Sequence, residues 1–194
     1  ITMSDCRLME ECGRAHFMTR RFDRVPDGKL HLQTLCGLAH MDFNQAGAYS
    51  YEQAFQVTRQ LGLPQPDSAE LFRRAVFNIV ARNQDDHTKN ISFLMDRSGT
   101  WRLAPAYDVI YSYNPTGAWT SRHQMALGGK RDQFTREDLL EAASDANVKP
   151  RESKEILSEV VAAVKGWPRF ADEAGVAQRH VTAIAKAQRV QLSS

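Results

Sequence analysis

The chain has 194 residues, 42% of them hydrophobic and 25% charged, which is the composition of a globular domain able to build a core. This composition excludes disorder as the default state, and no apolar run approaches the roughly 18 residues of a membrane span. Lys and Arg number 25 against 23 Asp and Glu, and this near balance argues against direct binding to nucleic acid. Three cysteines with no C-x-x-C pair indicate reduced thiols in a cytoplasmic protein.

The N-terminal segment combines short β-compatible runs with turns. Residues 5–10 and 15–22 are β-compatible, and the Glu-Cys-Gly-Arg sequence between them predicts a hairpin. Val-Pro-Asp-Gly at 25–28 predicts a turn. The spacing then changes to that of one face of a short helix, with Leu32, Leu35 and Leu38.

Two helices are expected before the centre of the chain. Ser50 and Gln53 predict a capping box that opens a helix ending at Gly62. Asp67 and Glu70 predict a second capping box. The helix that follows has a wide apolar face formed by Leu71, Phe72, Ala75, Val76, Ile79 and Val80.

The second half of the chain starts with a polar segment at 83–90 and continues into a predicted hairpin over 91–103, with its turn at Asp-Arg-Ser-Gly. About 25 residues without a clear period follow, a length typical of functional or mobile loops. The remainder reads as three helices: one capped by Thr135, one from Pro150 to Gly166, and one over 176–192. We therefore predict an α+β fold that is mainly α, with two small β-hairpins.

The polar segment, Asn-Gln-Asp-Asp-His-Thr-Lys-Asn, contains an Asp-x-His-x-x-Asn pattern formed by Asp85, His87 and Asn90. Asp108 follows at the far end of the predicted hairpin. Because a tight hairpin brings its two ends together, we expect Asp108 to lie near Asp85 and Asn90.

Phosphoryl transfer requires such a set, because one carboxylate orients the attacking hydroxyl while a carboxamide and a second carboxylate hold Mg²⁺. In protein kinases the catalytic Asp and the metal-binding Asn are five positions apart, as Asp85 and Asn90 are here. Two other interpretations remain: a polar loop that merely caps a helix and turns a hairpin, and a metal-dependent hydrolase with Asp85, His87 and Asp108 as ligands.

Three motifs, RFDR at 21–24, NQDDHTKN at 83–90 and LAPAYD at 103–108, occur in the order of the HipA family and resemble its C-terminal region. HipA proteins are bacterial serine/threonine protein kinases that act as toxins of toxin–antitoxin pairs. The resemblance covers the chain from about Met18 onward. The Asp-x-His-x-x-Asn form is also similar to that of lipid kinases of the phosphatidylinositol class.

The resemblance implies roles for the residues that match the family's catalytic motifs. Asp85 corresponds to the catalytic Asp, and Asn90 and Asp108 correspond to the Mg²⁺ ligands. His87 falls where the family has an imidazole beside the catalytic loop, where it either contacts the nucleotide or only orders the loop.

The nucleotide-binding residues implied by the resemblance are Phe22 and Asp23 at the hinge between the lobes, with His87 and Lys89 near the phosphates. Lys89 could equally be a solvated charge. Many family members have Glu at the position of Arg20, a difference that backbone contacts to adenine would tolerate and a side-chain contact would not.

By this resemblance residues 1–24 form a hinge-side hairpin at the edge of an N-terminal lobe, and residues 25–194 form the helical C-lobe of a kinase. The whole protein would transfer the ATP γ-phosphate to a protein hydroxyl, with an aminoacyl-tRNA synthetase as substrate and an antitoxin as partner. The residues before the hinge contain a single glycine, Gly13, and no lysine. Kinases cover the phosphates with a loop that is usually Gly-rich and neutralise them with a lysine. We therefore expect the chain alone to be inactive and to bind ATP weakly. The alternative is a non-catalytic lobe that binds an antitoxin.

Overall fold

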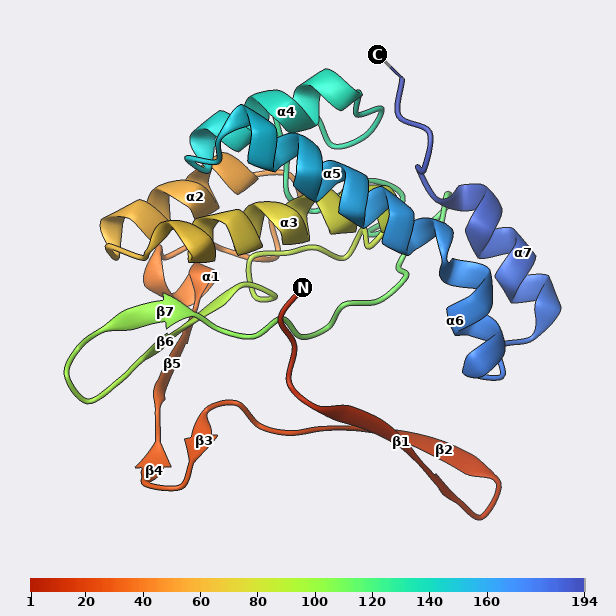
Figure 1. Ribbon diagram of the computed structural model, residues 1–194, viewed down its shortest axis with the longest axis horizontal. Coiled ribbons are helices and arrows are strands. Elements are labelled where there is room, and N and C mark those ends of the chain that lie inside the picture. Colours follow the sequence, from red (N-terminus) through yellow and green to blue (C-terminus); the bar gives the residue numbers. More distant parts are fainter. Residues whose placement is uncertain (194) are drawn as a thin grey trace.

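The computed structural model describes residues 1–193. Within them seven helices form the body of the molecule, and the short antiparallel strands lie below α2 and α3 in the view of Figure 1. The helices are α1 (Leu35–Leu38), α2 (Tyr51–Gln60), α3 (Gln65–Ala81), α4 (Arg136–Asp145), α5 (Pro150–Lys165), α6 (Trp167–Glu173) and α7 (Gln178–Ala187). The strands are β1 (Cys6–Glu11), β2 (Arg14–Thr19), β3 (Arg24–Val25), β4 (Gly28–Lys29), β5 (His31–Thr34), β6 (Ser92–Met95) and β7 (Trp101–Leu103). The predicted α+β fold, mainly α, is confirmed.

The predicted N-terminal hairpin is formed by β1 and β2, which pair antiparallel with Leu8 opposite Phe17. Its two-residue turn has Cys12 at φ 50° and Gly13 at φ 73°, the left-handed geometry that matches the twist of the strands. Every residue of both strands is exposed, and the hairpin projects away from the helices (Figure 1). The predicted turn at 25–28 is also present, between β3 and β4.

The helix predicted to include Leu32 begins three residues later, at Leu35. Leu32 instead lies on β5, opposite Leu94 of β6, so the second predicted hairpin (β6–β7) is extended by β5 into a three-stranded sheet. Thr34 ends the strand and caps α1 by accepting a hydrogen bond from the Gly37 N–H at 3.2 Å. Strand pairing between distant segments therefore overrides the local leucine spacing.

The capping box predicted at Asp67 and Glu70 is wrong, because α3 begins at Gln65 directly after Pro64. The Asp67 carboxylate accepts a hydrogen bond from the Leu103 N–H at 2.8 Å, which ties the first turn of α3 to β7. Glu70 pairs with Arg74 on the same helix. The capping box predicted for α2 is confirmed, and Thr135 caps α4 as predicted.

Helix α3 is the centre of the hydrophobic core and packs against α5 and α2, and α4 packs against α5 and α2 (Figure 1). The predicted C-terminal helix is shorter than expected and is preceded by α6, which the sequence did not predict. After α7 the chain folds back onto α3, where the Arg189 N–H donates to the Val80 carbonyl at 2.8 Å. Within residues 1–193 no helix has the length and hydropathy of a membrane span.

Candidate active site

The polar segment starts where α3 ends, at Arg82, whose left-handed backbone (φ 61°) turns the chain out of the helix. The next residues, Asn83 and Gln84, pair with the segment around Ser112, and the Gln84 N–H donates to the Ser112 carbonyl at 3.2 Å. Ser112 lies four residues after Asp108, so this pairing places the polar segment beside the chain that carries Asp108.

The Asp85–Asn90 segment is closed on itself by the Asn90 side chain. Asn90 Nδ2 donates to the Asp85 carbonyl at 2.9 Å, and the Asn90 N–H donates to the His87 carbonyl at 2.9 Å. The amide nitrogen of Asn90 is thus engaged, which leaves its Oδ1 for a ligand. The Asp85 carboxylate is 37% exposed, and its Oδ1 lies 3.9 Å from His87 Nε2.

Asp108 has a left-handed backbone at φ 55°, a conformation that non-glycine residues adopt rarely and that is concentrated at functional sites. Its carbonyl accepts a 3.4 Å hydrogen bond from Asn83 Nδ2. The residue is exposed and lines one cleft together with Asn83, His87 and Asn90. The structure therefore brings Asn90 and Asp108 to the same cleft, which is part of what the hairpin argument expected, whereas Asp85 does not line this cleft.

The residues predicted to bind the nucleotide at the hinge have partners within the chain. The Phe22 ring stacks on Tyr107, with centroids 5.9 Å apart, next to Asp108. The Asp23 carboxylate is held by Arg21, at 2.9 and 2.7 Å, and by Arg24. The hydrogen bonds from Arg21 lower the pKa of Asp23 although burial opposes them. The carboxylate of Asp23 is thus paired, so we expect any contact with a nucleotide here to use the backbone.

Lys89 is exposed, and its ammonium lies 3.9 Å from the centre of the Phe43 ring. His87 is packed near the same ring, at 6.3 Å between centroids, and its buried Nδ1 has no hydrogen-bond partner within residues 1–193. His87 lies beside Asp85, and the roles of His87 and Lys89 stay predictions. Over the described residues, no three His, Cys, Asp or Glu side chains form a group that could hold a metal ion, so Asp85, His87 and Asp108 are not gathered as a hydrolase centre would require.

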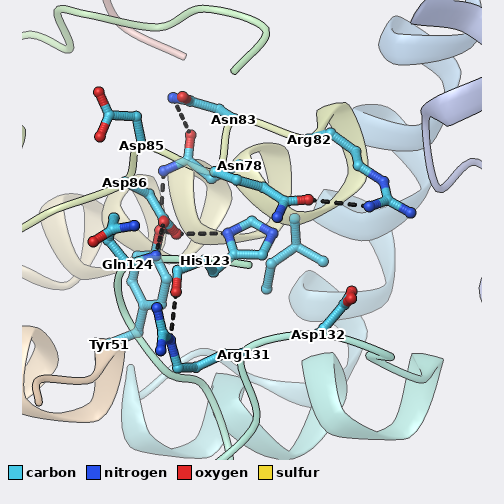
Figure 2. A network of polar contacts seen from close by, with 12 residues as sticks. Tyr51, Asn78, Arg82, Asn83, Asp85, Asp86, His123, Gln124, Arg131 and Asp132 are labelled. Carbon is cyan, nitrogen blue, oxygen red and sulfur yellow. Dashed lines mark hydrogen bonds and ion pairs between the residues drawn. The ribbon is translucent and has the colours of Figure 1, made fainter. Parts of the chain in front are cut away.

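The sequence did not predict a role for Asp86, which directly follows the candidate catalytic residue Asp85. Asp86 is buried at the centre of a polar network (Figure 2). Its Oδ2 accepts hydrogen bonds from the Tyr51 hydroxyl and from His123 Nδ1, both at 2.8 Å, and its Oδ1 accepts from the Gln124 N–H at 2.8 Å. Burial raises the pKa of this carboxyl, but these interactions outweigh it and the net pKa lies below the usual value. The Asp85 carboxylate points away from the network (Figure 2).

The network continues on both sides of Asp86. Asn78 Nδ2 donates to the Tyr51 oxygen at 3.0 Å. On the other side Arg189 donates to His123 Nε2 at 3.0 Å and pairs with Asp132. No sequence signal marked these residues: His123 lies in the aperiodic loop, and Arg189, expected within the last helix, lies beyond the end of α7.

A family model described as the HipA-like C-terminal domain matches residues 1–168. The chain is 29% identical over 108 residues to "Putative kinase Y4mE" and 33% identical over 95 residues to "Putative kinase Y4dM", both of Sinorhizobium fredii. These alignments cover 50% and 47% of this chain but only 26% and 22% of those proteins.

The fold matches a chain in the Shewanella oneidensis toxin–antitoxin complex of HipA, HipB and operator DNA, with a TM-score of 0.75 at 16% identity. The match covers 96% of this chain and 49% of that one, so this chain spans about half the length of the solved relative. The family match over most of the chain, together with this fold, establishes that the chain belongs to the HipA family as a HipA-like C-terminal domain.

Proposed function

We propose that this chain is the C-terminal lobe of a serine/threonine protein kinase that transfers the γ-phosphoryl group of ATP to a protein hydroxyl. The observation that carries the proposal is the closed Asp85–Asn90 loop, whose Asn90 shares one cleft with the strained Asp108. A loop that only capped α3 and turned a hairpin would not require Asp108 to hold a left-handed backbone beside Asn90.

The residues of the cleft fit Mg²⁺, which prefers oxygen ligands and keeps several waters. Asn90 would bind it through Oδ1, because its nitrogen is engaged by the Asp85 carbonyl, and Asp108 would bind it through its exposed carboxylate. The cation, when bound, would offset charge on the phosphates of ATP. The partly exposed carboxylate of Asp85 can accept the proton of the attacking hydroxyl and orient it.

The other predicted contacts are consistent with a nucleotide spanning this face of the lobe. Phe22 would contact the adenine side, and Asp23 would contribute backbone groups, since its carboxylate is paired with two arginines. Lys89 is exposed and could reach the phosphates, and His87 packs beside Asp85 and would order the loop. A second lobe would supply the phosphate-covering loop and the lysine.

The partner and the substrate follow from the family. The matched Shewanella complex contains HipB with HipA, which supports an antitoxin as partner and a toxin role for the kinase. An aminoacyl-tRNA synthetase is the protein substrate that the family resemblance proposes. The near-neutral charge of the chain argues against direct contact with DNA.

The test is phosphoryl transfer by the protein that joins this lobe to its ATP-binding lobe. Asp85→Asn should lower the rate by about 10²–10⁴-fold, the usual contribution of a positioned general base, and should leave the thermal midpoint unchanged because the side chain is partly exposed. Asp172→Asn, at an exposed position on α6, is the matched control. Near wild-type autophosphorylation by Asp85→Asn would refute the catalytic assignment and favour the non-catalytic, antitoxin-binding lobe.

A further inference from the structure

Asn83 carries an unexplained polar atom in the catalytic cleft. The residue is 3% exposed, and its Oδ1 has no hydrogen-bond partner within residues 1–193. Asn83 lines the cleft together with Asn90 and Asp108. A buried acceptor without a partner is unusual in a folded protein and indicates a water, an ion or a ligand at that position.

The orientation of the Asn83 amide is fixed by a chain of hydrogen bonds that starts at Asp86. An ionised carboxylate only accepts, so the Tyr51 hydroxyl donates to Asp86, at 2.8 Å. The Tyr51 oxygen is then the acceptor for Asn78 Nδ2, at 3.0 Å, which turns the Oδ1 of Asn78 toward Asn83.

The final link decides which Asn83 atom lacks a partner. Asn78 Oδ1 is an acceptor and lies 3.0 Å from Asn83 Nδ2 (Figure 2). Asn83 Nδ2 also donates to the Asp108 carbonyl. Rotating the Asn83 amide by 180° would set its oxygen against two acceptors, so the observed orientation is the only one the chain permits. An acceptor, Oδ1, is therefore what remains to be satisfied in the cleft.

The hydrogen bonds from Arg189 through His123 to Asp86 also run in one direction, from donor to acceptor, toward Asp86. Arginine has no acceptor, so Arg189 donates to His123 Nε2, and the proton of a neutral His123 lies on Nδ1, facing Asp86. Successive hydrogen bonds polarise one another, and a donated N–H makes the oxygen of the same amide a stronger acceptor. Asn83 Oδ1 is thus an oxygen suited to a cation or to a water bound to one.

We propose that Asn83 is a third protein oxygen donor of the cation site, binding the divalent cation through Oδ1 either directly or through one cation-bound water. This inference rests on the proposed function, which assigns the cation to Asn90 and Asp108. Asn83 Nδ2 also donates to the backbone carbonyl of Asp108, so the Asn83 side chain would contact both the proposed cation and the backbone of Asp108, which is itself proposed to bind that cation. The oxygens of Asn83, Asn90 and Asp108 are the type that Mg²⁺ and Mn²⁺ bind.

The test measures binding of Mn²⁺ to the whole chain by the electron-spin resonance of free Mn²⁺, alone and with ADP. Asn83→Ala should weaken Mn²⁺ affinity by about tenfold, the lower end of the effect of removing a supporting partner from a metal site. Asn83→Ser is a second variant in case the alanine protein does not fold. Ser153→Ala is the matched control, because it removes a buried hydrogen-bonding side chain on α5 that does not line the cleft, and it should leave Mn²⁺ affinity unchanged. Equal losses for Asn83→Ala and Ser153→Ala would mean that removing any buried polar side chain weakens Mn²⁺ binding, and would overturn the proposal.

A wild-type measurement gives an independent answer. In crystals of the chain with Mn²⁺ and ADP, the anomalous peak of manganese should lie within about 5 Å of Asn83 Oδ1, the reach of one bridging water. A peak beside Asn90 and Asp108 but farther from Asn83 would overturn the inference. If instead Asn90→Ala and Asp108→Ala leave Mn²⁺ affinity unchanged, the cation site of the proposed function is itself wrong. If Asn90→Ala and Asp108→Ala weaken Mn²⁺ binding and Asn83→Ala does not, only the assignment of Asn83 fails.

Discussion

Asp86→Asn tests the polar network most directly, because the change keeps the size of the side chain and alters only its hydrogen bonding. The carboxylate accepts three hydrogen bonds, from Tyr51, His123 and the Gln124 N–H. An amide retains one acceptor oxygen. Whichever way it is turned, its NH₂ group meets a donor, either the Gln124 N–H or the pair formed by the Tyr51 hydroxyl and His123 Nδ1–H.

The expected loss of stability follows from these contacts. Hydrogen bonds to a charged group contribute about 1.5–3 kcal/mol each, and an unsatisfied buried donor costs about 1–3 kcal/mol. Relief from burying a charge offsets part of that sum. The net loss should be about 3 kcal/mol, which for a chain of this length corresponds to a fall in Tm of about 6–12 °C.

The same geometry predicts that this loss depends on Arg189. Arg189 forces His123 to accept at Nε2, so in the wild type the imidazole cannot accept at Nδ1. In an Arg189→Ala background the proton of His123 is free to move to Nε2, and Nδ1 can then accept a hydrogen bond from the new amide. Asp86→Asn should therefore cost about 1–2 kcal/mol less in that background than in the wild type.

Urea unfolding followed by circular dichroism, on the wild type, both single variants and the double variant, measures this coupling. The interaction energy should be well outside the 0.3–0.5 kcal/mol scatter of independent sites. Strict additivity of the two substitutions would show that Arg189 does not set the tautomer of His123, and the polarity assigned to the whole network would be refuted.

Two further predictions concern stability. The pKa of Asp86 is lower in the folded chain than its usual value near 4, so the stability that the Asp86 carboxylate contributes is complete above about pH 4 and is lost as the pH falls through the folded pKa. The difference in unfolding free energy between the wild type and Asp86→Asn should therefore be constant above about pH 5 and shrink below it. A difference that grows on acidification would contradict this sign. Thr135→Ala removes the oxygen that accepts the Asp138 N–H at 3.2 Å and should cost about 1 kcal/mol, or about 2–4 °C in Tm, whereas Ser158→Ala on the exposed face of α5 should cost nothing. Equal Tm values for the two alanine variants would contradict the capping role.

Local chemistry was enough to predict the elements whose ends are set by their own residues. The capping box at Ser50, the helix cap at Thr135 and the turn at Cys12 and Gly13 were all found from neighbouring residues. The failures occurred where a distant segment decides. Asp67 caps no helix because the Leu103 N–H lies within its reach, a contact across 36 positions.

The candidate site shows the same division between local and distant information. The spacing of Asp85 and Asn90 was readable because a single short loop carries both and the Asn90 side chain closes it. Nothing in the Asp-Asp pair indicated that Asp86 would be buried, since its partners lie 35 to 38 positions away.

The two adjacent aspartates divide the tasks of the loop between them. Asp86 is anchored inward by its hydrogen bonds, while the side chain of Asp85 points outward, as Figure 2 shows. The buried carboxylate is ionised only because Tyr51, His123 and a backbone N–H supply donors, and those donors come from α2 and the loop after Asp108. The exposed carboxylate of Asp85 therefore owes its position to contacts that it does not make itself. A substitution that disturbs Asp86 should consequently misplace Asp85 as well as lower the stability of the fold, because Tyr51, which donates to Asp86, is part of the hydrophobic core.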